Sequence, residues 1–200
     1  LLAPEFRVEQ RLSGLYGTAP DDRHEALIDA AGADPADGEG DAGGATERTG
    51  DETPLDFASA VARLGDPASR DQVARVTLRH LGRHLELCAL FTVQGDVLEG
   101  WRGRGPGSDV VPQLHLTIEP DSAFRVVLDT GAHYLGPFAE NEAHARFLTS
   151  LRREHPRNVL IAPLRLQERT VALLYADNGA LEIPHRVASE AMVFVNHVQS

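Results

Sequence analysis

Two histidines four residues apart are the first residues of this chain that could do chemistry. His80 and His84 lie at positions i and i+4 of a helix predicted over residues 70–85, and that spacing can chelate a metal ion. Arg79 and Arg83 flank the pair, however, and would repel a cation, and no acidic residue lies between the two histidines. No cluster of cysteine and histidine exists to build a zinc site. A solvated helix face is therefore the favoured interpretation, and no metal is expected.

A glycine- and arginine-rich stretch at residues 100–105, GWRGRG, could cradle a phosphate. Phosphate-binding loops normally open a helix, so that backbone N–H groups and the helix dipole face the anion. Here the glycines follow a predicted strand and precede Pro106, with no helix start, so a flexible loop between strands is favoured. No Ser-His-Asp or Cys-His arrangement can be tied together by spacing. The chain is therefore not expected to be an enzyme.

Composition and charge narrow the function further. The single cysteine, Cys88, cannot form an internal disulfide, and no apolar run approaches the roughly 18 residues that cross a membrane, so a cytoplasmic protein without a membrane partner is expected. The net charge of −11 is uneven: residues 1–53 hold 13 acids and 4 arginines, whereas residues 54–200 hold 17 acids and 15 arginines. A nearly neutral domain without a basic cluster in its sequence argues against nucleic acid as the partner.

The chain divides into three parts. Residues 31–53 contain no Val, Ile, Leu, Met or aromatic residue but six glycines and seven acids, so we expect an acidic, flexible linker. Residues 1–30 are too few for an independent core and are interpreted as the tail of an upstream segment or as a docking helix. The folded domain is expected over residues 54–200.

Hydrophobic periodicity gives the order of elements in this domain. Helices are predicted over 57–64, 70–85, 123–129, 140–153 and 184–199, and strands over 88–93, 97–102, 114–118, 133–135, 159–166 and 171–175. The last two strands form an apolar hairpin. Pro163 indicates an edge or bulge in its first strand, and Asp177 with Asn178 is interpreted as turn chemistry leading toward the last helix.

Three segments carry a resemblance to a known family. They are ALFTVQGDVLEGWRGRG (89–105), SAFRVVLDTGAHYLG (122–136) and the final hairpin, with its internal proline and closing Asp-Asn pair. In this order they resemble GAF domains, small α/β sensory modules of signalling proteins, although a PAS or profilin-like sheet shares some of the pattern. The resemblance implies an α+β fold: a central antiparallel sheet of about six strands, N- and C-terminal helices packed on one face, and a ligand pocket on the other.

The ligands associated with the family can be checked against these residues. The cyclic-nucleotide signature Asn-Lys-Phe-Asp-Glu needs a lysine, and the chain has none. Bilin-binding relatives need a cysteine beside the pocket, whereas Cys88 opens the first strand next to the helix layer and is better explained as a small buried hydrophobe. Methionine sulfoxide reductases of this fold need several cysteines. No cofactor is therefore expected.

Two surfaces remain as candidate sites. The family topology would gather aromatic and polar side chains around the pocket, where they would either line a ligand site or fill it; filling is favoured. The candidate pocket residues are Trp101, His115, Phe124, Arg125, His133 and Tyr134.

The last helix is the other surface. One interpretation of its apolar stripe is that it only closes the core. The family, however, commonly dimerises through its first and last helices, and Met192 and Phe194 lie on different sides of the helix, which favours a second apolar contact. The candidate dimer residues are Val187, Ala191, Met192, Phe194, Val195 and Val198.

These observations lead to two hypotheses. The first is a non-catalytic GAF-like regulatory module of a bacterial signalling protein, which acts through dimerisation and through contacts with upstream or partner proteins. The alternative is a sensor that binds a small molecule in the pocket on the sheet face.

Overall fold

A computed structural model of the protein describes residues 53–64, 69–166 and 168–199. Its centre is one six-stranded sheet, in which each neighbouring pair is antiparallel and the strand order is β3-β2-β1-β6-β5-β4. The strands are β1 (Leu87–Gln94), β2 (Val97–Arg104), β3 (His115–Thr117), β4 (Tyr134–Gly136), β5 (Val159–Leu166) and β6 (Arg169–Asp177). The two predicted hairpins therefore meet at the middle of the sheet, and the predicted α+β fold is confirmed.

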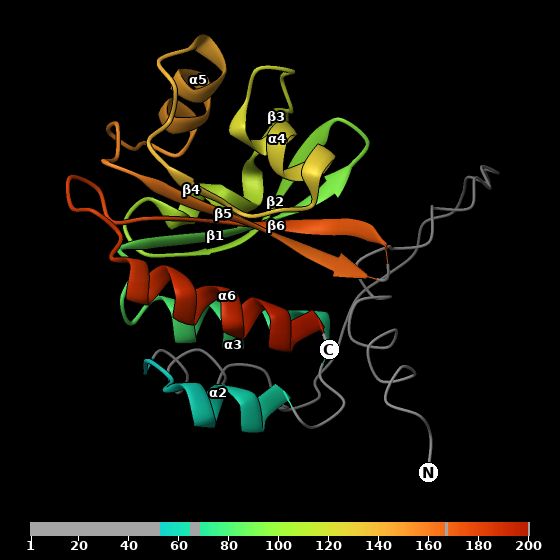
Figure 1. Ribbon diagram of the computed structural model, residues 1–200, viewed down its shortest axis with the longest axis vertical. Coiled ribbons are helices and arrows are strands. Elements are labelled where there is room, and N and C mark those ends of the chain that lie inside the picture. Colours follow the sequence, from blue (N-terminus) through green and yellow to red (C-terminus); the bar gives the residue numbers. More distant parts are fainter. Residues whose placement is uncertain (1–52, 65–68, 167, 200) are drawn as a thin grey trace, which may run out of the picture.

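Helices cover both faces of the sheet (Figure 1). On one face lie α3 (Arg70–Leu81) and α6 (His185–Gln199), as predicted for the N- and C-terminal helices. On the other face lie α4 (Ala123–Thr130), α5 (Glu142–Ser150) and the 3₁₀ helix η2 (Ser108–Gln113). The short helix α2 (Phe57–Leu64) packs outside the α3/α6 pair and forms a further layer. Because both faces are covered, the central strands are apolar on both sides.

Local capping sets the bounds of these helices. The side chains of Ser69, Ser122 and Asn141 accept hydrogen bonds from the first turns of α3, α4 and α5. The sequence predicted a first long helix that runs to residue 85, but α3 ends at Leu81 with Gly82 as its cap. The four residues after Gly82 instead lead the chain into β1, which begins at Leu87. None of the described helices is long and apolar enough to span a membrane.

The glycine-rich stretch is not a flexible loop, so that prediction is wrong. Strand β2 continues to Arg104, and η2 packs directly on it. A Cβ atom on Gly100 would lie 1.6 Å from the backbone oxygen of Val111, and one on Gly103 would lie 2.8 Å from the Cβ of Ser108. The glycines are therefore needed for the close approach of η2 to the strand, and they do not surround a phosphate site.

Pro163 lies at a free strand edge, as predicted. Strand β4 pairs only with residues 159–161 of β5, and the pairing of β5 with β6 is irregular just after Pro163. The side chain of Gln199 covers the open edge: the Arg165 N–H donates to its Oε1 (2.9 Å), and its Nε2 donates to the Pro163 carbonyl (3.3 Å). The end of α6 is thereby fixed to the sheet.

Asp177 is more than the turn residue that the sequence predicted. Its side chain is completely buried, accepts hydrogen bonds from the Tyr175 hydroxyl (2.8 Å) and the Gly179 N–H (2.8 Å), and forms an ion pair with Arg153. Arg153 also donates to Glu86 (2.8 Å). Burial alone would lower the pKa of Arg153, but its hydrogen bonds to Asp177 and Glu86 raise it above its usual value. This network joins the end of β6 to the segments before β1 and β5.

Candidate functional site

The sheet face opposite α3 and α6 is filled by aromatic rings. They come from β1, β6, α4, α5 and the segment after β4, and they are Phe91, Phe124, Phe138, His144, Phe147 and Tyr175. Phe147 is at the centre, with its ring centroid 4.6 Å from that of Phe124 and 4.9 Å from that of Tyr175. Each of the six side chains is at most 4% exposed. The protein's own side chains therefore fill this part of the sheet face, and of the candidate pocket residues only Phe124 is among the six rings.

His144 belongs to this filling and was missed by the sequence reasoning. Its ring stacks on Phe138 at 4.1 Å, with 3° between the planes. Its Nδ1 lies 2.9 Å from the Ala139 carbonyl, and its Nε2 accepts the backbone N–H of Ala123 at 2.9 Å. Because a carbonyl only accepts, Nδ1 carries the proton. Both ring nitrogens are thus used to hold α5 against the start of α4. The only feature of the sequence that could have indicated the role of His144 is its position three residues after Asn141, which caps α5.

A small open hollow remains at the edge of this aromatic filling, between β3 and the helices α4 and α5. Its volume is about 130 Å³, and Leu98, Phe124 and Phe147 contribute apolar lining. His115 and the ion pair between Arg146 and Glu119 (3.2 Å) contribute polar lining. Pockets for drug-sized ligands run from about 300 to 1,000 Å³, so this hollow is suited at most to a small polar molecule.

The predicted pocket residues do not form one site. His115 and Phe124 both line the hollow. Tyr134 packs beside the aromatic filling and donates its hydroxyl to the Pro137 carbonyl. Arg125 instead forms an ion pair with Asp96 (2.6 Å) at the β1–β2 turn.

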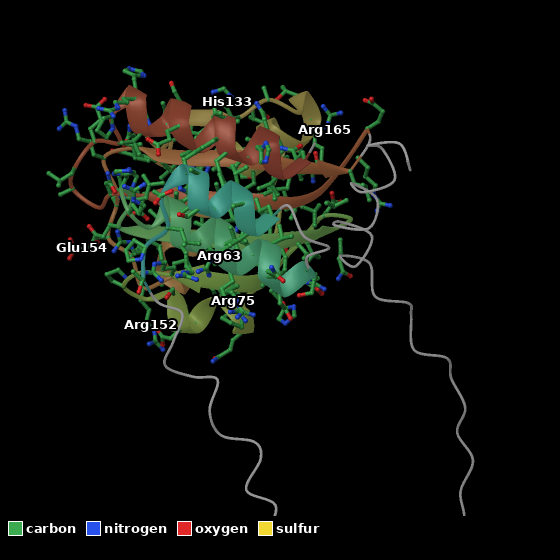
Figure 2. All side chains as sticks on the ribbon, turned by 90° about the horizontal axis from the view of Figure 1, so that it is seen from below. Arg63, Arg75, His133, Arg152, Glu154 and Arg165 are labelled. Atoms are coloured by element: carbon green, nitrogen blue, oxygen red, sulfur yellow. The ribbon has the colours of Figure 1, made fainter. Side chains whose placement is uncertain are left out.

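The other two predicted pocket residues lie elsewhere. His133 is exposed just before β4, at the edge of the sheet (Figure 2). Trp101 lies on the opposite face of the sheet, where its Nε1 donates to Asp71 of α3 (3.3 Å) and the Arg70 guanidinium carbon lies 4.5 Å from its ring centroid. The pairing of β2 with β1 has a β-bulge at this point, and Trp101 lies on the helix side, whereas the resemblance placed it in the pocket.

The predicted dimer residues are mostly used inside the domain. Ala191, Phe194, Val195 and Val198 are at most 1% exposed, and they form part of the core between α6, α3 and the sheet. Val187 and Met192 are half-buried and keep some exposed surface. Val193, which the sequence reasoning did not select, is 57% exposed. The second apolar contact predicted for this helix is made by α2 of the same chain, where the Phe57 ring lies 5.9 Å from that of Phe194.

His80 sits where α2, α3 and α6 meet, so its assignment to a solvated helix face is wrong. Its side chain is completely buried between the rings of Phe57 (5.6 Å) and Phe194 (4.3 Å). Its Nδ1 lies 3.1 Å from the Leu55 carbonyl and therefore carries the proton, while Nε2 has no hydrogen-bond partner among the described residues and lies 3.8 Å from Glu190. Burial lowers the pKa of His80, although the Leu55 hydrogen bond and Glu190 oppose that shift.

The pair His80 and His84 is not arranged to bind a metal ion, and Cys88 is not arranged to act as a nucleophile. His84 lies in the exposed turn after α3, whereas the His80 ring is buried. In the part of the chain that the structure describes, no three His, Cys, Asp or Glu side chains are placed to hold a metal ion. Cys88 is completely buried on the helix side, as predicted, and burial raises the pKa of its thiol. A thiol that stays protonated is a poor nucleophile.

Comparison with known proteins gives a consistent fold. The structure is similar to the GAF domain of an Acinetobacter phosphoenolpyruvate-protein phosphotransferase (TM-score 0.54, 10% identity, 70% of this chain and 86% of that one). It is similar to residues 122 to 287 of a methyl-accepting chemotaxis protein (TM-score 0.57, 13% identity, 72% of this chain and 93% of that one). It is also similar to the phycocyanobilin-bound GAF domain of a cyanobacterial phytochrome (TM-score 0.57, 12% identity, 74% of this chain and 93% of that one). No protein-family model and no curated protein matches the sequence.

Proposed function

This chain has the GAF-domain fold, and from that premise we propose that it is a non-catalytic regulatory module of a bacterial cytoplasmic signalling protein. It acts through contacts of its helix layer, both in a homodimer and with upstream or partner signalling proteins. The single observation that carries the proposal is the aromatic filling of the opposite face. Six packed rings leave little room for a ligand there, so the helix layer is the better candidate for communication.

The proposed dimer contact centres on Val193 of α6. Its exposed side chain lies next to the half-buried Met192, and Val187 lies nearly two turns earlier on the same helix. At about 100° per residue, Val187, Met192 and Val193 point in different directions around α6, so the proposed contact rests on the exposed Val193 side chain. A two-fold axis would let the same side chain of a second copy pack against it.

A charge placed at Val193 tests this proposal. The full chain is expected to be a dimer by light scattering coupled to size exclusion, and Val193→Asp is expected to shift it to monomer without unfolding, because the side chain is outside the core. Leu181→Asp is the matched control, since Leu181 is 71% exposed in the loop before α6 and its replacement should leave the dimer intact. A wild-type monomer at the highest soluble concentration would refute the dimer.

A small-molecule sensor is the alternative, and the hollow beside β3 is the observation that favours it. Arg146 and His115 offer cationic and hydrogen-bonding groups above an apolar floor, a combination that suits a small carboxylate. Thermal-shift screening with short-chain and aromatic carboxylates tests this function. A ligand present at 100 times its dissociation constant adds about 2.7 kcal/mol to stability. A shift that Arg146→Ala abolishes would establish the sensor, and the absence of any shift supports the protein-contact function.

A further inference from the structure

Helix α2 forms the outermost layer on the helix side of the domain, where it packs on α3 and α6 (Figure 1). Hydrogen bonds to α3 hold both of its ends. Just before α2, the Leu55 carbonyl lies 3.1 Å from Nδ1 of His80, and at its end the Arg63 carbonyl accepts from Nε2 of Gln72 (3.3 Å). Because α2 takes no part in the strand pairing of the sheet, it can leave this place while the sheet stays intact.

His80 is the polar side chain that α2 closes over. Its ring is completely buried between Phe57 of α2 and Phe194 of α6, and its Nδ1–H donates to the Leu55 carbonyl. The lone pair of Nε2 has no hydrogen-bond partner among the described residues. A proton added there would lack an acceptor, because the Glu190 carboxylate, at 3.8 Å, is beyond hydrogen-bond distance. Since a buried charge without a hydrogen-bonded partner is strongly destabilising, the closed arrangement suits only the neutral ring.

Water can reach this nitrogen. Beside it lies a hollow of about 10 Å³, lined in part by His84, Val187 and Glu190. That is about the space that one water molecule needs. The side chain of Glu190 is 30% exposed, so a proton has a short route from solvent to Nε2 of His80.

Charged groups from two elements act on the His80 ring. Burial, the largest effect, lowers its pKa, and Arg83 and His84 after α3 lower it further. Glu190 of α6 and the Leu55 carbonyl, which lies just before α2, act in the opposite direction. The net shift is downward, so a proton binds better to a ring that α2 has uncovered than to the buried ring. By linkage, acid therefore favours the uncovered form.

Asp56, the acid at the start of α2, is not the sensor. It accepts hydrogen bonds from the backbone N–H of Ser59 (2.8 Å) and from the Ser59 hydroxyl (3.1 Å). These bonds keep the pKa of Asp56 below its usual range, so this carboxylate stays charged at about pH 5. The cap of α2 is therefore unchanged over the pH range in which histidines ordinarily titrate.

We propose that α2 is a strap that acid releases: when His80 takes up a proton, α2 leaves α3 and α6 while the sheet and the remaining helices stay folded. Each pH unit below about 6.5, where histidine ordinarily titrates, favours the released form by up to about tenfold. Between about pH 7.5 and 5, the released population therefore rises by up to about 30-fold. Release uncovers the side of Phe194 that Phe57 contacts, and so opens an aromatic surface that is closed at neutral pH. This device does not depend on the Val193 contact.

A cysteine under α2 reports the release on the full chain. Ala60→Cys places a thiol at a completely buried position of α2, and Cys88, in the core beneath the helices, is an internal reference. Dithiodipyridine, which also modifies thiols in acid, is added at about pH 7.5 and at about pH 5, and mass spectrometry identifies the modified cysteine. Rates are divided by those of the unfolded chain at the same pH, which removes the pH dependence of the reagent. The rate at position 60 should rise about 10- to 30-fold in acid while Cys88 stays protected.

Variants of His80 assign the effect. With His80→Phe in the same background, the rate at position 60 should be nearly independent of pH, because phenylalanine takes up no proton. His80→Gln keeps a donor for the Leu55 carbonyl and takes up no proton, so it makes the same comparison if the phenylalanine variant does not fold. His84→Ala is the matched control: His84 is exposed, and its replacement should leave the rise in place.

Several results would overturn the proposal. One is a rate at position 60 that is the same at both pH values, and another is a rise that the His80 variants retain. Modification of Cys88 together with position 60 would show that the whole domain unfolds rather than α2 alone. A rise that disappears in His84→Ala would assign the sensor to His84 and would equally refute the role of His80.

Discussion

Replacing His80 by alanine tests the idea that this buried ring holds three helices together. The substitution removes a side chain that packs between Phe57 and Phe194, and it leaves the Leu55 carbonyl without its donor. Large-to-small changes in a core cost about 2–5 kcal/mol, and an unsatisfied buried acceptor costs about 1–3 kcal/mol. If α2 moves partly into the cavity, both the cavity cost and the cost of the unpaired Leu55 carbonyl become smaller. We therefore expect a loss of roughly 3–5 kcal/mol in the free energy of unfolding, measured by urea denaturation at pH 7.5.

The pH dependence of stability follows from the lowered pKa of His80. In the unfolded chain this histidine titrates near its ordinary value of about 6.5. Its folded pKa is lower, so below about pH 6.5 the unfolded chain takes up a proton that the folded chain does not. Stability is therefore fully present above that pH and falls as the pH decreases toward the folded pKa, by at most about 1.4 kcal/mol per pH unit. Three other charged or titratable groups act on the pKa of His80: Glu190 raises it, whereas Arg83 and His84 lower it.

His80→Phe separates this titration from the packing. Phenylalanine keeps an aromatic ring between the two flanking phenylalanines but takes up no proton, so stability should fall less steeply for the variant than for the wild type between pH 7.5 and 5. His84→Ala is the control, because His84 is exposed and its replacement should change stability by no more than about 0.5 kcal/mol. Parallel pH curves for the wild type and His80→Phe, or a loss below about 1 kcal/mol for His80→Ala, would refute the reasoning.

Three further predictions concern the sheet. Asp177→Ala should destabilise the domain by about 3–5 kcal/mol in urea denaturation, because it leaves the mostly buried Arg153 charge without this partner; a loss below about 1 kcal/mol would contradict the network. Gly100→Ala should lower the melting temperature by more than Gly95→Ala. A Cβ at Gly100 collides with the backbone of η2, whereas one at Gly95 meets nothing within 4 Å and is strained only by the positive φ of 59°; equal shifts would disprove the close approach. Cys88 should react with Ellman's reagent only in denaturant, since burial raises its pKa, and rapid reaction of the native protein would show that the site opens.

The sequence predicted the fold well because its signals are local. Alternating and continuous apolar runs depend on neighbouring residues, so the two hairpins and most helices were found within a few residues of their observed bounds. The edge position of Pro163 was also readable, because proline lacks the donor that a central strand needs. The 3₁₀ helix η2 was missed, since Ser108–Gln113 contains Pro112 and has no helical period.

The candidate sites were harder to predict because they depend on which face each side chain takes. Trp101 lies on the helix side beside a bulge in β2, and no pattern in the sequence marks that bulge. Similarly, the apolar stripe of α6 shows that the helix is buried, but it does not say what buries it. The contact of Phe57 with Phe194 shows that α2 covers part of the stripe.

The sequence by itself determined the elements, their order and the absence of the family's lysine- and cysteine-based signatures, because each of these depends on residue type and on spacing along the chain. Only the tertiary structure decided that the pocket face is filled by rings, that His80 is buried and that Asp177 anchors a network. Burial and ion pairing are properties of residues that meet in space. A residue such as His80, polar in the sequence, therefore becomes part of the core only when α2 closes over it.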